Sequence, residues 1–388
     1  MTRGVSLLGA TGSIGRSVLE VVRRHPERLR LVALAAYGRD PESLAAAAAE
    51  FRPALVAVAA PRAAAALAGR LPAGTELAVG EEGLLAAATH PDAQRVVAAM
   101  VGAAGLKPAH AALAAGRDLA LANKEALVVA GGLLVRLAAA TGAAILPIDS
   151  EHVALHQALR CGERSEVRRL VLTASGGPFL GRRRETWDAI RPAEALRHPT
   201  WSMGAKISVD SATLLNKALE LSEASHLFAV PAERIDVVVH PQSIVHSLVE
   251  FCDGSWLAQM SPNDMVFPIQ YALAHPERWP SPFPPLQPEA LGALTFQPLD
   301  QEAFPAVRLA RAALAMGESG PAVLNAANEV AVGAFLAGDA LFTAIMPVVE
   351  ATLAAHAPAP VGSLDEALAW DAWGRERARA ELHELARR

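Results

Sequence analysis

The first 150 residues alternate short apolar runs with segments of helical composition. Six of the runs have the length of buried strands, and none shows the polar alternation of a strand with one solvated face. Strands that are buried on both faces and joined by helices form a parallel sheet wrapped by helices, so this part is predicted to be Rossmann-like α/β. The predicted strands are 5–8, 31–35, 55–58, 96–99, 119–122 and 144–148, and the predicted helices are 14–24, 41–50, 63–67, 82–87, 108–115 and 126–140.

A glycine-rich turn follows the first predicted strand, with the sequence Gly9-Ala10-Thr11-Gly12-Ser13-Ile14-Gly15. Between a strand and a helix, this GxxGxxG form lets a pyrophosphate approach the free amides of the helix N-terminus. After the second strand, Arg39 is suited to a 2′-phosphate, which favours NADPH. Asp40 has two other interpretations, as the acid of an NAD site or as the cap of the next helix. A tight turn that binds no ligand is the alternative to a nucleotide site.

Two carboxylates follow the last predicted strand of this region, in the segment Asp149-Ser150-Glu151-His152. In an open α/β sheet, ligands bind at this end of the strands. Together with Glu220, Asp149 and Glu151 would form an oxygen-rich site for Mg²⁺ or Mn²⁺. One alternative is that Asp149 and Ser150 only cap a helix. Another is zinc, because His152 and His156 are four residues apart, although no HExxH motif is present.

The stretch 206–220 places polar groups on a predicted helix. Asn216 and Glu220 share one helical face, with Lys217 beside them, and Ser211 precedes the helix. A lysine, an amide and a hydroxyl suit a phosphate, and a nearby carboxylate suits a hard cation. A solvated amphipathic helix with an ordinary cap is the alternative interpretation.

Two further polar segments follow predicted strands. Asn123-Lys124-Glu125 lies at the ligand-binding end of the parallel sheet, where charged residues are also common as helix starts. Ser175-Gly176-Gly177 exposes backbone amides beside a hydroxyl, which suits an anion, although taken alone it is only a turn.

The pattern changes after residue 149, where the strand-like runs 170–173, 235–239 and 247–251 lie among irregular stretches typical of an α+β domain. The glycine-flanked stretch between 175 and 207 has the composition of a lid. Beyond a proline-rich segment, four helices are predicted at 302–316, 321–336, 342–356 and 363–387. The predicted domains are an NADPH-binding domain at 1–149, a catalytic domain at 150–274 with a lid at about 175–207, a linker at 275–299 and a C-terminal helical domain at 300–388.

Composition narrows the classes of partner. The net charge of −5 over 388 residues provides no electrostatic footprint for nucleic acid. No apolar run approaches the roughly 20 residues that a membrane span needs. Two cysteines indicate neither a disulfide framework nor a cysteine-based zinc site. With no cationic leader before the first strand, we expect a cytoplasmic protein.

Taken in order, these segments closely resemble the 1-deoxy-D-xylulose 5-phosphate reductoisomerase family of the non-mevalonate isoprenoid pathway. The resemblance covers nearly the whole chain. The motifs that carry it are the glycine turn, 121–125, 149–152, 175–179, 198–204, 206–220, His240-Pro241-Gln242-Ser243 and Asn325-Ala326-Ala327-Asn328-Glu329.

The resemblance implies conversion of 1-deoxy-D-xylulose 5-phosphate to 2-C-methyl-D-erythritol 4-phosphate, with NADPH, one Mg²⁺ or Mn²⁺ ion and a homodimer. The implied metal ligands are Asp149, Glu151 and Glu220, which with Lys124 form the catalytic set. The implied substrate contacts are Lys124, Ser150, Glu151, Ser175, His198, Trp201, Met203, Ser211, Asn216, Lys217 and Glu220, of which Trp201 and Met203 resemble lid residues. The implied cofactor contacts are Thr11, Gly12, Ser13, Ile14, Gly38, Arg39, Asn123, Glu125 and Gly204. Asp40 departs from the asparagine expected in the family.

Two other functions fit parts of the same pattern. One is an ordinary NADP-dependent dehydrogenase, such as one acting on semialdehydes, which would need neither three metal carboxylates nor a phosphate pocket. The other is a sensor that binds NADPH without turnover.

Overall fold

The computed structural model describes residues 2–201 and 203–387, so Ser202 of the predicted lid lies outside the described residues. Contacts divide the chain into two compact units. Unit 1 contains the chain up to residue 126, together with 134–153 and 264–285. Unit 2 contains 127–133, 154–263 and the chain from 286 onward.

Unit 1 is built on a seven-stranded sheet in the order β4-β3-β2-β1-β5-β6-β7, in which every pair of neighbours is parallel. The predicted Rossmann-like sheet is therefore confirmed. The edge strand β4 was not predicted, because its four residues include no buried position that would mark it as a strand. The strands are β1 (Arg3–Leu8), β2 (Leu29–Ala36), β3 (Leu55–Val58), β4 (Glu76–Val79), β5 (Arg95–Ala98), β6 (Asp118–Leu121) and β7 (Ile145–Pro147).

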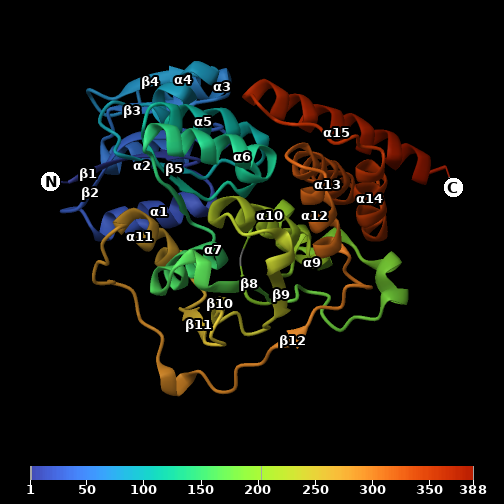
Figure 1. The fold of residues 1–388 in the computed structure, drawn as a ribbon. Coiled ribbons are helices and arrows are strands. Elements are labelled where there is room, and N and C mark those ends of the chain that lie inside the picture. The colour runs from blue at the N-terminus through green and yellow to red at the C-terminus, as the bar shows by residue number, and fades with distance from the viewer. Residues whose placement is uncertain (1, 202, 388) are drawn as a thin grey trace. The chain divides into compact units, whose positions relative to one another are not determined.

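Helices cover both faces of this sheet, with α1 and α11 in contact on one face and α4 and α5 in contact on the other (Figure 1). Helix α6 leaves helical geometry at Ala130, where it bends. The helices of this unit are α1 (Ser13–Arg24), α2 (Pro41–Phe51), α3 (Pro61–Leu67), α4 (Gly80–Ala88), α5 (Leu106–Ala114), the ends of α6 (Lys124–Thr141), the start of α7 (Ser150–Ala158), and α11 (Val266–Ala274).

A buried arginine explains why α11 packs in unit 1, although more than a hundred residues separate it from the end of β7. Arg95 of β5 is 3% exposed and donates from Nη1 to the carbonyl oxygens of Ala272 and Leu273, at 2.6 and 2.9 Å. Its Nη2 pairs with Asp118 at 2.9 Å. The guanidinium thus satisfies carbonyl groups that the C-terminus of α11 would leave without partners.

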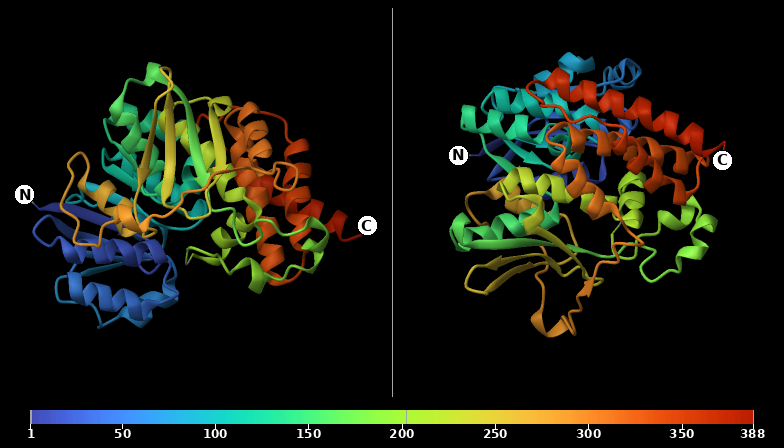
Figure 2. Two further views of the ribbon diagram at one scale, coloured as in Figure 1. Left: turned by 90° about the horizontal axis from the view of Figure 1, so that it is seen from below. Right: turned by 45° about the vertical axis from the view of Figure 1, so that its right-hand side comes forward.

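Unit 2 contains a five-stranded mixed sheet in the order β11-β10-β8-β9-β12, whose strands lie side by side in Figure 2. Strands β8 and β9 are parallel and the other pairs are antiparallel. The sequence predicted β8, β9 and β10 but neither edge strand. The strands are β8 (Val167–Ala174), β9 (Ile235–Val239), β10 (Val245–Phe251), β11 (Trp256–Met260) and β12 (Gln297–Pro298).

The helices of unit 2 share one hydrophobic core with this sheet. Leu172 of β8, Leu219 of α10, and Leu324 and Phe335 of α13 all belong to that core. The predicted fold class is confirmed, including the run of helices at the C-terminus. These helices are the end of α7, α8 (Pro192–Ala195), α9 (Ala205–Thr213), α10 (Leu215–Phe228), α12 (Ala306–Ala315), α13 (Ser319–Ala337), α14 (Ile345–Ala354) and α15 (Leu364–Leu385).

Short 3₁₀ turns join several of these elements, at Ala103–Gly105, Leu159–Cys161, Arg164–Glu166, Arg184–Ala189, Ala232–Arg234, Pro288–Ala290 and Phe342–Ala344. Across the described residues, no helix is both long enough and apolar enough for a membrane crossing. The predicted domain boundaries stay a prediction.

Candidate active site

In the glycine turn of unit 1, backbone atoms lie where the side chain of a larger residue would have to fit. Gly9 has φ +96°, and a Cβ built there would lie 2.3 Å from the carbonyl oxygen of Ala99. A Cβ on Gly15 would lie 2.2 Å from the carbonyl oxygen of Gly9. Gly12 precedes α1, whose N-terminus receives no side-chain cap from any described residue. The first amides of α1 are therefore available to an anion, with Thr11, Ser13 and Ile14 around them.

The exit of β2 carries the second predicted cofactor segment. Gly38 has φ +98°, and a Cβ there would lie 2.4 Å from the Cβ of Ala63. The guanidinium of Arg39 lies 5.0 Å from the ring centre of Tyr37. Asp40 caps α2 by accepting from the amide of Ser43 at 3.0 Å. Hydrogen bonding by the side chain of Ser43, and then by its amide, holds the pKa of Asp40 below its ordinary value. Of the two uses predicted for Asp40, the structure shows the cap.

The ends of β6 and β7 present buried polar side chains. Asn123, Lys124 and Glu125 are at most 7% exposed. Asn123 donates from Nδ2 to Glu125 at 2.9 Å, and Lys124 forms an ion pair with Asp149. Amide, ammonium and carboxylate groups thus gather where an open α/β sheet binds ligands.

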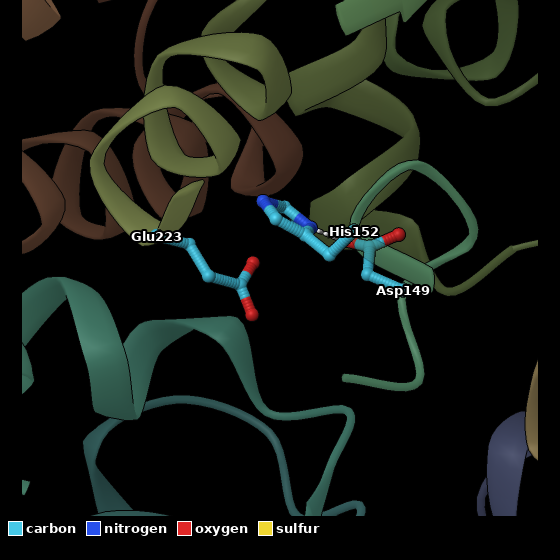
Figure 3. Close-up of side chains that lie close together, drawn as sticks. All are labelled: Asp149, His152 and Glu223. Carbon is cyan, nitrogen blue, oxygen red and sulfur yellow. Dashed lines mark ion pairs between the residues drawn. The ribbon is translucent and has the colours of Figure 1, made fainter. Parts of the chain in front are cut away.

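Asp149 lies at the start of α7 beside His152, whose Nδ1 is 4.0 Å from its carboxylate (Figure 3). Next in the chain, Ser150 donates a hydrogen bond to Glu151. Glu223, also drawn in Figure 3, belongs to α10 of unit 2 and is 1% exposed. The predicted ligands Asp149 and Glu151 therefore both lie in unit 1, and Glu220 lies in unit 2.

In unit 2, Ser175 and His198 form a hydrogen-bonded pair, with 2.9 Å between Oγ and Nε2. Nδ1 of His198 accepts from the amides of Thr200 and Trp201 at 3.1 and 3.0 Å. That nitrogen therefore carries no proton, so Nε2–H donates to Ser175. Burial and the nearby charge of Lys217 lower the pKa of His198, which keeps the ring neutral.

The hydroxyl of Ser175 is left with a proton to donate. Its oxygen accepts from His198 and also from the amide of Gly177, at 3.2 Å. Both lone pairs are then engaged, so the O–H can donate to a bound ligand. A phosphate oxygen is a suitable one.

Two glycines bring this turn against α9. Gly176 and Gly177 have φ of +89° and +69°, a region that side chains disfavour. A Cβ on Gly177 would lie 2.5 Å from the carbonyl oxygen of Ser211. The Ser175 turn and the predicted phosphate ligand Ser211 are therefore neighbours.

The junction of α9 and α10 carries the other predicted phosphate ligands. Leu214 adopts the left-handed conformation, with φ +59°, and separates the two helices. On the first turns of α10, both Asn216 and Lys217 donate to the carboxylate of Glu220, which is fully buried. The alternative interpretation, a solvated amphipathic helix, is wrong for the start of α10, because Lys217 is only 4% exposed.

The remaining predicted contacts of unit 2 belong to the stretch of chain that connects β8 to α9. Trp201 has its ring centre 6.4 Å from that of His246, and Met203 is half-buried. Gly204 is exposed and precedes α9. Gly204 is the one predicted cofactor contact that belongs to unit 2.

Three polar residues near these groups were not among the predicted site residues. His152 was noted only for a zinc alternative, although its spacing of three from Asp149 on a helix places the two side by side. Asp210 and Asn328 are both buried and bonded to each other at 2.8 Å. No local pattern joins residues 118 positions apart, so this pair has no sequence signal of its own.

Comparisons with known proteins bear on the whole chain. Family models match three segments: 1-deoxy-D-xylulose 5-phosphate reductoisomerase at residues 5–131, its C-terminal domain at 145–228, and a further DXP reductoisomerase C-terminal domain at 260–377. A 1-deoxy-D-xylulose 5-phosphate reductoisomerase of Symbiobacterium thermophilum is 53% identical over 386 residues, covering 98% of this chain and 99% of the relative. The enzyme of Thermomicrobium roseum is 50% identical over 98% of this chain and 97% of its own length.

The chain belongs to the 1-deoxy-D-xylulose 5-phosphate reductoisomerase family. The predicted family and enzyme class are confirmed. A reductoisomerase of Zymomonas mobilis solved with NADPH has a TM-score of 0.92 and 42% identity, with 98% of this chain and 99% of that chain covered. Another, solved with NADPH, fosmidomycin and magnesium, has a TM-score of 0.92 and 42% identity, with 99% of both chains covered. NADPH and magnesium, which are bound in these solved reductoisomerases, are the cofactors that the sequence predicted.

Proposed function

We propose that this chain converts 1-deoxy-D-xylulose 5-phosphate to 2-C-methyl-D-erythritol 4-phosphate, using NADPH and one divalent cation. The observation that carries this proposal is the phosphate pocket of unit 2. There Ser175 is hydrogen-bonded to His198, the backbone of Ser211 lies against Gly177, and the charge of Lys217 acts on His198. Ser211 and Lys217 are buried, and Ser175 and His198 are half-buried. An ordinary dehydrogenase with the same nucleotide turn has no need for such a set.

In the proposed pocket, three uncharged hydrogen-bond donors and the ammonium group of Lys217 would bind the phosphate. Ser175 would donate its free O–H, Ser211 its hydroxyl and Asn216 its amide, while Lys217 would supply the charge. Because Nδ1 of His198 accepts from two backbone amides, the ring proton lies on Nε2, where it orients Ser175. Because the phosphate lies away from the reacting carbons, its binding energy can hold the substrate in place while the carbon skeleton rearranges.

Asp149, Glu151 and Glu220 are the proposed ligands of the cation. The donor set fits, because carboxylate oxygens are what Mg²⁺ and Mn²⁺ prefer. Asp149 and Glu220 each already hold an ammonium group, of Lys124 and Lys217, so both suit a cationic partner. When bound, the cation would stabilise negative charge on substrate oxygens. Lys124 would hold a proton at Nζ beside those oxygens, and Ser150 would bind the substrate.

NADPH is proposed to bind unit 1 at the glycine turn. Two observations support this proposal: the turn requires glycine at 9 and 15, because a Cβ there would overlap backbone oxygens, and the start of α1 has no side-chain cap that would compete with an anion. We assign the pyrophosphate to the turn at 11–14, the 2′-phosphate to Gly38 and Arg39, and further contacts to Asn123, Glu125 and Gly204. When bound, NADPH would supply hydride chemistry to the substrate. Trp201 and Met203 are proposed to cover the substrate and exclude water.

A homodimer acting in the cytoplasm is proposed as the working form. Edge strand β11 exposes Trp256 and Met260, at 44% and 45%, which is consistent with an interface between copies. The thiols of Cys161 and Cys252 are exposed and unbridged, as in a reducing compartment. Light scattering that gives the mass of one chain would contradict the dimer, and a protein found outside the cytoplasmic fraction would contradict the location.

The test is NADPH oxidation with 1-deoxy-D-xylulose 5-phosphate, with and without Mg²⁺ or Mn²⁺. Glu220→Gln is expected to lower turnover by at least about a thousandfold while NADPH still binds, since a metal ligand is lost. Glu233→Gln, at an exposed glutamate of the same unit, is the matched control and should leave turnover unchanged. Metal-independent oxidation would favour the dehydrogenase, and NADPH binding without turnover under any metal would favour the sensor.

A further inference from the structure

Asp210 is a buried carboxylate that the proposed chemistry does not use. It lies on α9 directly before Ser211 and is 1% exposed. Its Oδ2 pairs with Nζ of Lys206, one turn earlier on α9, at 2.8 Å, and its Oδ1 accepts from Nδ2 of Asn328 at 2.8 Å. Burying a carboxylate is costly unless its oxygens are bonded. Because Lys206 belongs to α9 itself, only the contact with Asn328 joins this carboxylate to another helix.

Asn328 brings the second of these contacts from a different part of unit 2. It lies on α13, is fully buried, and reaches a helix that lies 118 positions earlier in the chain. Asn325 lies one turn earlier on α13 and is also fully buried, but it donates to Glu329 of its own helix at 3.1 Å. Glu329 in turn pairs with Arg375 of α15 at 2.6 Å. Helix α13 thus bonds to α15 through Glu329 and to α9 through Asn328.

The position of α9 decides where the phosphate ligands lie. Ser211 follows Asp210 directly, and its carbonyl oxygen packs against Gly177, next to Ser175. Two residues after Ser211, α9 ends and the left-handed Leu214 leads into α10 with Asn216 and Lys217. A shift of α9 would therefore separate Ser211 from the Ser175 turn and move the start of α10.

We propose that Asn328 is a positioning residue for substrate phosphate: it holds Asp210, and through Asp210 it holds α9 with Ser211 in the pocket. The inference rests on the proposed phosphate pocket and adds a role for the segment Asn325-Ala326-Ala327-Asn328-Glu329. Asn328 touches neither substrate nor cofactor in this role. It acts through the hydrogen bond to Asp210.

The test compares Asn328→Ala with Asn325→Ala in the full-length protein. Both remove the same atoms from fully buried sites one helical turn apart, so both should lower the melting temperature. Only Asn328→Ala is expected to raise KM for 1-deoxy-D-xylulose 5-phosphate, by about tenfold, with kcat changed less than about threefold. The inhibition constant of inorganic phosphate should rise in parallel, and the NADPH dissociation constant should stay unchanged in both variants.

Equal KM values in the two variants, or a loss confined to kcat, would overturn the positioning role. If Asn328→Ala does not fold, Asn328→Ser takes its place, measured in the same way against Asn325→Ser. Failure of the proposed function is a separate result, because the unmodified protein would then show neither turnover nor inhibition by inorganic phosphate.

Discussion

The two units prepare their ligand sites by opposite means. In unit 1, the glycine turn places backbone amides at the start of α1, and what it requires is the absence of atoms at Gly9 and Gly15. In unit 2, the proposed phosphate pocket is made of side chains such as Ser175, His198 and Lys217, and it would require donors that are held in place, as Ser175 is by His198. The first site should thus be sensitive to one added methyl group, and the second to one lost hydroxyl.

Among substitutions that compare the two units, the largest expected effect is that of adding a methyl group to the turn. In Gly15→Ala, the Cβ would lie 2.2 Å from the carbonyl oxygen of Gly9, so the turn must open. We expect the NADPH dissociation constant to rise by about a hundredfold, measured by fluorescence titration.

Gly333→Ala is the control for this experiment. Gly333 lies in α13 with nothing within 4 Å of the added Cβ, so the substitution should leave NADPH binding unchanged. It should raise stability by about 0.5–1 kcal/mol, because alanine favours the helix. Unchanged NADPH affinity in Gly15→Ala would show that the close approach of the Gly9 carbonyl to residue 15 is not needed for NADPH binding.

A smaller effect is expected from removing one hydroxyl in unit 2. Ser175→Ala deletes the proposed phosphate donor and leaves Nε2–H of His198 without its acceptor. We expect KM for the sugar phosphate to rise about tenfold in steady-state assays, with no change in NADPH affinity. Ser225→Ala, which removes a hydroxyl bonded to the carbonyl of Val230 at 2.8 Å, is the control and should not change KM. A similar KM in wild type and Ser175→Ala would contradict the assignment of Ser175.

The smallest effect concerns pH. Burial and then the charge of Lys217 lower the pKa of His198 from 6.5, so at acidic pH the unfolded chain binds a proton more readily than the folded one. Stability is therefore retained above pH 6.5 and is lost as the pH falls from there toward the lowered pKa. His110 and His356 are shifted in the same direction by burial.

Urea unfolding at a series of pH values measures this contribution. His198→Asn should make the free energy of unfolding fall less steeply below pH 6.5 than in wild type, with part of the slope kept by the other two histidines. Identical slopes would mean that the environment of His198 does not disfavour its charged form.

Much of unit 1 could be predicted because its signals are local. Each central strand is a short apolar run, and the glycine turn lies between strand and helix, so period and spacing were enough. Edge strands β4 and β11 were missed, since exposed strands carry weaker apolar patterns. The site residues were predicted largely through motifs shared with one family, and their individual roles stay a prediction.

By itself, the sequence determined the parallel sheet of unit 1, the glycine turn between β1 and α1, the helices of the C-terminal part and the family. Only the tertiary structure decided that α11 joins unit 1 through Arg95 and that Asn328 holds Asp210. It also decided that the proton of His198 sits on Nε2, because two amides occupy Nδ1. The physical reason is common to all three. Each depends on a buried polar group whose partner is chosen by three-dimensional packing, and the cost of leaving such a group unpaired then determines the arrangement.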